Sequence, residues 1–173
     1  MVEKIVKIIV GAFAGLTALP FGKQLIVFII SLMPVLELRG GLIAAALLKM
    51  DPVQSYVISI IGNIIPVPFI LFFFESILNR MRRSNVSIFR AFTSWVDRRV
   101  EKNRGQIEKY GFWGLAIFVG IPLPGTGAWT GCMVASVLHM DRRQAFKSVM
   151  IGILIASVIM MLVSFGVISN LIR

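Results

Sequence analysis

The feature that most constrains the fold is a hydrophobic segment that occurs twice and is broken in its middle each time. Laying residues 20–80 over residues 110–170 without a gap pairs distinctive residues as well as apolar ones. The pairs include Pro34 with Pro124, Gly41 with Gly131, Met50 with Met140, Asp51 with Asp141, Gln54 with Gln144 and Gly62 with Gly152. In a membrane protein, interrupted hydrophobic segments in equivalent halves of the chain indicate a transport site.

The composition predicts a multi-pass protein of the cell (inner or plasma) membrane. Of the 173 residues, 57% are hydrophobic, and the mean hydropathy is +0.88. The apolar runs Val57–Phe74 and Val149–Ile168 approach or reach the length needed to cross a bilayer, about 20 residues at 1.5 Å each.

The basic residues indicate a topology and not a nucleic-acid partner. Although the net charge is +10, nine of the 18 Lys and Arg residues lie in 80–109, so we expect this loop to be cytoplasmic. Within it, Phe89, Phe92, Trp95 and Val96 follow helical spacing. This spacing predicts an amphipathic helix on anionic headgroups, with a plain charged connector as the alternative. Residues 1–19 occupy the equivalent position before the first copy of the repeated segment, and we expect them to form either an interfacial helix or a short membrane span.

Each broken segment allows two interpretations. The breaks are 34–41 and 122–131, and each apolar arm has about 10 residues, or ~15 Å as a helix, which is half the hydrocarbon thickness. A segment of this kind is either a kinked full span or a re-entrant hairpin. If both re-enter, Arg142, Arg143 and Lys147 join the basic loop inside and place 12 of the 18 basic residues there. The positive-inside rule therefore favours hairpins.

We therefore predict an all-α integral membrane protein built as an inverted repeat. Each repeat comprises an interfacial amphipathic helix, a re-entrant helical hairpin and a transmembrane helix. The single membrane domain 1–173 divides into repeat one, 1–80, with hairpin 22–49 and span 53–79, and repeat two, 81–173, with basic amphipathic segment 81–109, hairpin 111–140 and span 143–170.

The two hairpin tips predict a shared binding site near the membrane midplane. Irregular backbone at this depth is tolerated only where protein buries it or water reaches it. Each second arm begins with a helix N-terminus, which carries partial positive charge and favours an anion such as phosphate or carboxylate. The expected substrate contacts are Arg39, Gly40, Gly41, Asn63, Pro124, Gly125, Thr126, Gly127, Trp129, Thr130 and Gly131.

Glu37 and Arg39 are the ionisable residues of the first tip. Such groups within a membrane segment are costly and usually functional, so we expect Glu37 to carry protons and Arg39 to contact substrate. The alternative is a permanent Glu37–Arg39 pair that holds the hairpin together. Asn63 either lines the substrate path or hydrogen-bonds a broken backbone. Trp129 either caps the cavity or has a packing role. Thr126 and Thr130 either contact substrate or hydrogen-bond carbonyls freed in the turn.

The sequence contains no nucleophile–base–acid set, phosphate-binding loop or metal motif. We therefore expect no enzymatic activity, no cofactor and no metal.

The two broken motifs resemble those of a known family. Pro34–Gly41 (PVLELRGG) and Ile121–Gly131 (IPLPGTGAWTG) look like the small multidrug export family, considered a distant relative of the DedA (VTT-domain) superfamily. The resemblance covers nearly the whole chain. It implies two re-entrant hairpins in an inverted repeat, and proton-dependent movement of lipids such as polyprenyl phosphates. Glu37 and Arg39 match the acidic and basic hairpin positions of those relatives, whereas the second tip departs from the DedA pattern because it carries no arginine.

The resulting functional hypothesis is a proton-coupled transporter or flippase for an amphiphile with an anionic head. Its partners would be membrane lipids, this substrate and protons, and the thin wall that 173 residues make around a midplane cavity is compatible with a homodimer. Two alternatives stay open: a proton-coupled exporter of small cationic drugs, and a non-transporting membrane organiser.

Overall fold

The computed structural model describes residues 2–123 and 125–167, and all its regular elements are helical. They are α1 (Val2–Ala12), the 3-10 helix η1 (Ala14–Ala18), α2 (Gly22–Leu32), α3 (Glu37–Leu47), α4 (Pro52–Ile64), α5 (Pro66–Arg82), α6 (Ser87–Gly120), α7 (Ala128–Val137), α8 (Arg142–Met161) and the π-helical η2 (Leu162–Val167). This confirms the predicted all-α class. Two helical stretches, Pro52–Arg82 and Arg142–Gly166, are long and apolar enough to cross a membrane.

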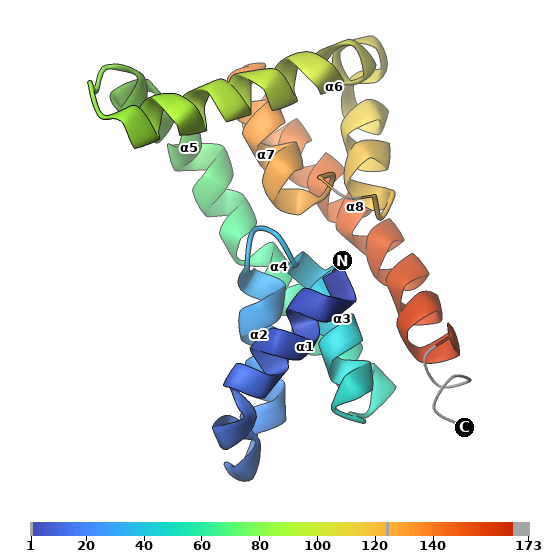
Figure 1. The fold of residues 1–173 in the computed structure, drawn as a ribbon. Coiled ribbons are helices and arrows are strands. Elements are labelled where there is room, and N and C mark those ends of the chain that lie inside the picture. The colour runs from blue at the N-terminus through green and yellow to red at the C-terminus, as the bar shows by residue number, and fades with distance from the viewer. Residues whose placement is uncertain (1, 124, 168–173) are drawn as a thin grey trace. The chain divides into compact units, whose positions relative to one another are not determined.

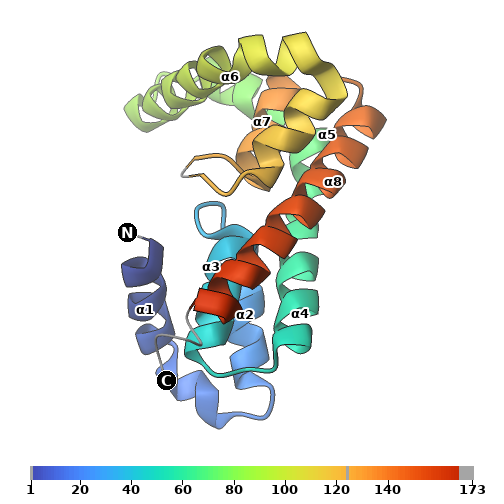
Figure 2. The same ribbon diagram turned by 90° about the vertical axis from the view of Figure 1, so that its right-hand side faces the viewer.

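The helices form two compact units (Figures 1 and 2). The first unit comprises Met1–Ile65 and Ile153–Arg173, and therefore holds α1 to α4 and the end of α8. The second unit is Pro66–Gly152, which holds α5 to α7 and the start of α8.

In the first unit, α2 and α3 pack side by side as an antiparallel hairpin (Figure 1). Each has 11 residues, or about 16 Å of helix, which confirms the predicted short arms. The predicted break at 34–41 was too wide, because only residues 33–36 are non-helical and α3 already begins at Glu37. Gly40 and Gly41 are helical although glycine is a poor helix former, since both are buried against neighbouring side chains.

The second unit contains the other hairpin, formed by the end of α6 and α7. The helix α6 bends at Gly111, where φ is 51° and ψ is −120°, and Figure 2 shows the change of direction. The part before the bend covers most of the predicted basic segment 81–109, so this segment is helical, while its place at a membrane surface stays a prediction. The non-helical stretch extends over 121–127, of which Pro124 lies outside the described residues, and Ala128–Gly131 belongs to α7 instead of the predicted break.

Both hairpins end in the same backbone motif. Lys49 and His139, each directly before a Met-Asp pair, have left-handed φ values of 51° and 53°. In each case the hydrogen bonds are those of a Schellman cap. The bonds are Lys49 N–H to Ala46 O (3.1 Å), Met50 N–H to Ala45 O (3.0 Å), His139 N–H to Ser136 O (3.2 Å) and Met140 N–H to Ala135 O (3.0 Å).

The helices that follow start alike as well. The Asp51 carboxylate accepts a hydrogen bond from Gln54 N–H at 2.8 Å, and the Asp141 carboxylate accepts one from Gln144 N–H at 2.9 Å. Both aspartates are therefore helix N-caps.

The core of the first unit joins the hairpin to the N-terminal helix. Val6 of α1 is fully buried with Ile26 and Ile30 of α2 and Ala44 of α3. The 11 residues of α1 extend about 16 Å, so α1 alone is too short to cross a bilayer core of about 30 Å.

The close packing of α3 generates a stability prediction. A Cβ atom at Gly41 would lie 1.9 Å from Ser31 Oγ and 2.9 Å from Ser59 Oγ. We therefore expect Gly41→Ala to lower the free energy of unfolding in detergent by about 1–3 kcal/mol, the usual cost of overpacking. Adding Ser31→Ala, which removes the nearest atom, should restore part of this loss.

The matched control is Gly105→Ala, since a Cβ atom there meets nothing within 4 Å. This substitution should leave stability unchanged or raise it by up to about 1 kcal/mol. Equal losses for the two glycines would contradict the packing described here.

Candidate functional site

The buried polar side chains of the first unit include Ser31 of α2, Glu37 of α3, and Ser59 and Asn63 of α4. The relative exposures are 0% for Ser31 and Ser59, 1% for Asn63 and 4% for Glu37. Ser31 Oγ donates to Val27 O at 2.8 Å, whereas Ser59 Oγ and Asn63 Oδ1 have no hydrogen-bond partner among the described residues. Buried polar atoms without partners are rare in native proteins, so this polar cluster (Ser31, Glu37, Ser59 and Asn63) is a candidate place for water or a ligand.

Two glycines bring the three helices of this cluster together. Gly41 of α3 lies against Ser31 of α2 and Ser59 of α4. A Cβ atom at Gly62 of α4 would lie 2.9 Å from both Phe28 O and Ser31 Cβ of α2. Small residues of this kind let helix backbones approach closely in membrane proteins.

Helix direction places Glu37 and Asn63 on the same side of the contact between Gly41 and Ser59. Glu37 is one turn before Gly41 on α3, and Asn63 is one turn after Ser59 on α4. Because α3 and α4 run antiparallel (Figure 2) and Gly41 lies next to Ser59, both steps lead toward the hairpin tip. Glu37 and Asn63 therefore both lie on the tip side of the contact between Gly41 and Ser59.

Glu37 also has an unusual backbone conformation. Its φ is 52°, in the left-handed region, which costs a non-glycine residue about 1–2 kcal/mol. Strain of this kind is typical of functional sites. Arg39, two residues further on, is half-buried.

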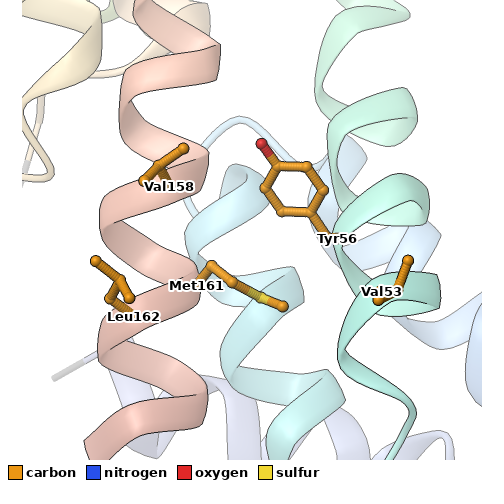
Figure 3. A pocket seen from close by; sticks show the side chains of 5 residues that line it. All are labelled: Val53, Tyr56, Val158, Met161 and Leu162. Atoms are coloured by element: carbon orange, nitrogen blue, oxygen red, sulfur yellow. The ribbon is translucent and has the colours of Figure 1, made fainter.

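An apolar pocket of about 290 Å³ lies in the same unit, between α4 and the end of α8. It is lined by Val53, Tyr56, Val158, Met161 and Leu162, and Figure 3 shows the Tyr56 ring and the Met161 side chain between the two helices. The Tyr56 hydroxyl oxygen is 2.9 Å from Ser157 Oγ. Tyr56 precedes Asn63 by two turns on nearly the same face of α4, or about 10 Å along the axis.

The tip of the second hairpin depends on two glycines. Gly125 has φ 84° and Gly127 has φ 132°, values that L-amino acids with a side chain rarely adopt. Gly127 is the N-cap of α7 and offers no side-chain hydrogen bond to its first turn. Gly131 has a packing role, because a Cβ atom there would lie 2.5 Å from Val119 Cγ2.

The other predicted residues of this tip are held within the second unit. Thr126 Oγ1 lies 2.8 Å from Ile121 O and 2.9 Å from Leu123 O, which supports the alternative that it bonds carbonyls freed in the turn. Thr130 is buried and Trp129 is half-buried.

The structure brings an arginine to the second tip that the sequence analysis missed. Arg99 of α6 lies with Nη1 3.4 Å from Gly125 O, and its guanidinium carbon is 5.6 Å from the centroid of the Trp95 ring. A Cβ atom at Gly125 would come within 2.3 Å of Arg99 Nη1. The tip motif itself lacks an arginine, yet a guanidinium group from another helix stands against it. No local signal predicts this contact, because 26 residues separate its partners.

The predicted site residues therefore fall into two groups. Glu37, Arg39, Gly40, Gly41 and Asn63 belong to the first unit, and the residues of 125–131 to the second. Their meeting in one site stays a prediction. Among the described residues, no group of three or more His, Cys, Asp or Glu could hold a metal ion.

Two helical stretches that are long and apolar enough to cross a membrane indicate a membrane protein. The chain belongs to the family described as "Putative small multi-drug export protein", whose sequence profile matches residues 37–159. This description is of an export protein and not of an enzyme, and with the long apolar helices it indicates a membrane location. Searches of curated proteins and of solved structures find no significant match.

The contact of Arg99 with the second tip predicts a local change in dynamics. Replacing Arg99 with Gln removes the cation that lies against Gly125, so hydrogen–deuterium exchange of the amides of 125–127 should become faster. Removal of one charge-assisted hydrogen bond, worth about 1.5–3 kcal/mol, corresponds to at least about tenfold faster exchange.

The control is Arg98→Gln, since Arg98 is the exposed neighbour of Arg99. It removes the same charge and should leave exchange at the tip unchanged. If both variants speed exchange equally, Arg99 does not hold the tip.

Proposed function

We propose that the protein is a membrane transporter or flippase. It moves an amphiphile with an anionic head, such as a lipid phosphate, through a midplane site between two re-entrant hairpin tips, in exchange with protons. The observation that carries the proposal is the carboxyl-bearing side chain of Glu37, which is buried at the start of α3 in the same unit as the unpartnered oxygens of Ser59 and Asn63.

Glu37 is the proposed proton carrier. A charged carboxylate among membrane helices is costly, so its protonation state responds to a neighbouring cation or to access by water. The unpartnered oxygens of Asn63 and Ser59 support a hydrated path that would bring protons to this group. Alternating exposure of Glu37 to the two sides would then couple proton movement to transport.

The anionic head would be recognised by positive groups at both tips. Arg39 supplies a cation at the start of α3, and Arg99 supplies one at the second tip although it belongs to α6. The N-terminus of α7, capped by Gly127 without a side-chain bond, adds partial positive charge. The hydrocarbon tail would lie in the apolar pocket of Val53, Tyr56, Val158, Met161 and Leu162, about 10 Å along α4 from Asn63.

The proposed architecture is an inverted repeat of interfacial helix, re-entrant hairpin and transmembrane helix. The matching Schellman caps at Lys49 and His139 and the matching aspartate caps support equivalence of the two halves. The proposed topology places the basic segment 80–109 and Arg142, Arg143 and Lys147 in the cytoplasm, in accordance with the positive-inside rule.

A second candidate is proton-coupled export of small cationic drugs. The family description favours it, and the buried Glu37 carboxylate would then bind the cation directly. Arg39 would compete for Glu37 and release the cargo.

Glu37→Gln separates these two functions. In proteoliposomes loaded with a fluorescent lipid phosphate, the wild type should change its rate with pH by up to about tenfold per unit, the limit for one proton. The Gln variant should still bind the lipid phosphate but lose this pH dependence. Under cation export the same variant should instead lose binding of a cationic dye.

The matched control is Glu101→Gln on the exposed surface of α6, which should retain the wild-type pH profile. Arg39→Ala should abolish movement of the lipid phosphate. If Arg39→Ala behaves as the wild type and neither protein moves lipid, the protein is a membrane organiser and not a transporter.

A further inference from the structure

The second unit contains two adjoining cavities away from the hairpin tip. The larger has a volume of about 400 Å³ and lies between α5 and the first turns of α8. The smaller, of about 190 Å³, extends from α5 to the end of α7. Leu71 and Arg142 line both cavities.

The larger cavity combines an apolar wall with positive charge. Leu71, Phe72 and Phe146 form the wall, and Arg142, Arg143 and Lys147 supply three cations, with no acidic residue in the lining. The Arg142 guanidinium carbon lies 5.2 Å from the centroid of the Phe72 ring, an arrangement that holds the cation next to the apolar surface. Such a surface is complementary to a molecule with a hydrocarbon chain and an anionic head.

The smaller cavity provides a further polar contact. Ser136 is 7% exposed, lines this cavity, and its Oγ has no hydrogen-bond partner among the described residues. The lining of this cavity also includes Glu75. Glu75 Oε1 lies 3.0 Å from His139 Nε2, and the Asp141 carboxylate caps α8.

We propose that these cavities bind one anionic phospholipid. Its phosphate lies among Arg142, Arg143 and Lys147, where guanidinium and ammonium groups form charge-assisted hydrogen bonds, and the Ser136 hydroxyl donates to a headgroup oxygen. One acyl chain lies along Leu71, Phe72 and Phe146. The site is separate from Glu37 and Arg39, and binding there requires no transport.

The test titrates the purified protein in non-ionic detergent with phosphatidylglycerol, and native mass spectrometry measures the fraction that carries one lipid. The triple variant Arg142→Gln, Arg143→Gln, Lys147→Gln should raise the Kd about tenfold or more, because three charge-assisted contacts are lost. The control triple variant Lys4→Gln, Lys23→Gln, Lys49→Gln removes the same charge from exposed positions of the first unit and should leave the Kd nearly unchanged. Ser136→Ala should raise the Kd by about threefold, the effect of one neutral hydrogen bond.

A second pair of variants tests the chain-binding wall. Phe146→Ala should weaken phosphatidylglycerol binding, whereas Ile155→Ala, at a similarly exposed position of α8 (39% against 36%), should not. The proposal is overturned if phosphatidylcholine binds as tightly as phosphatidylglycerol, or if both triple variants weaken binding equally. Inorganic phosphate binding as tightly as the lipid would overturn it too, since the site would then recognise a free anion.

Discussion

The structure of the first unit depends on the short distance between three helix backbones at Gly41 and Gly62. Any side chain at Gly41 would collide with Ser31 and Ser59, so the close approach of α2, α3 and α4 requires glycine there. This approach encloses Ser31 and Ser59 between the helices, and Asn63 and Glu37 of the same unit are buried as well. The same contact that packs the hairpin thus creates a polar cluster among apolar helices, and a carboxyl group in such a place is expensive to maintain unless it has a function.

The tip of the second hairpin differs from the first in the origin of its positive charge. Its tip has no ionisable residue of its own from Ile121 to Gly131, and positive charge reaches it from α6 through Arg99. The left-handed glycines let the backbone present the Gly125 carbonyl to this arginine. Arg99 also lies over the Trp95 ring of the same helix, so the basic segment of α6 is directly in contact with the tip.

Much of the fold could be predicted from the sequence, because hydrophobic periodicity and helix breakers act locally. The short hairpin arms, the aspartate N-caps and the all-helical class follow from such local signals. The predicted breaks are wider than the observed ones, because Gly40, Gly41 and Gly131 are packed closely against neighbouring side chains and belong to helices. Glu37 and Asn63 were predictable as buried polar residues in apolar runs, and Ser31 and Ser59 carried the same signal. The contacts of Arg99 with Gly125 and of His139 with Glu75 were not predictable from the sequence, because they join residues 26 and 64 positions apart.

The central claim is that neither broken segment crosses the bilayer, so that the second repeat is inverted relative to the first. Cysteine accessibility tests it most directly, in a Cys132→Ala background with one cysteine introduced at position 94 or at position 141. In sealed cells, a membrane-impermeant maleimide should label neither site, and both should react once the cytoplasmic side is opened. Labelling of position 141 from outside, with position 94 protected, would contradict the inverted topology and the paired-tip site with it.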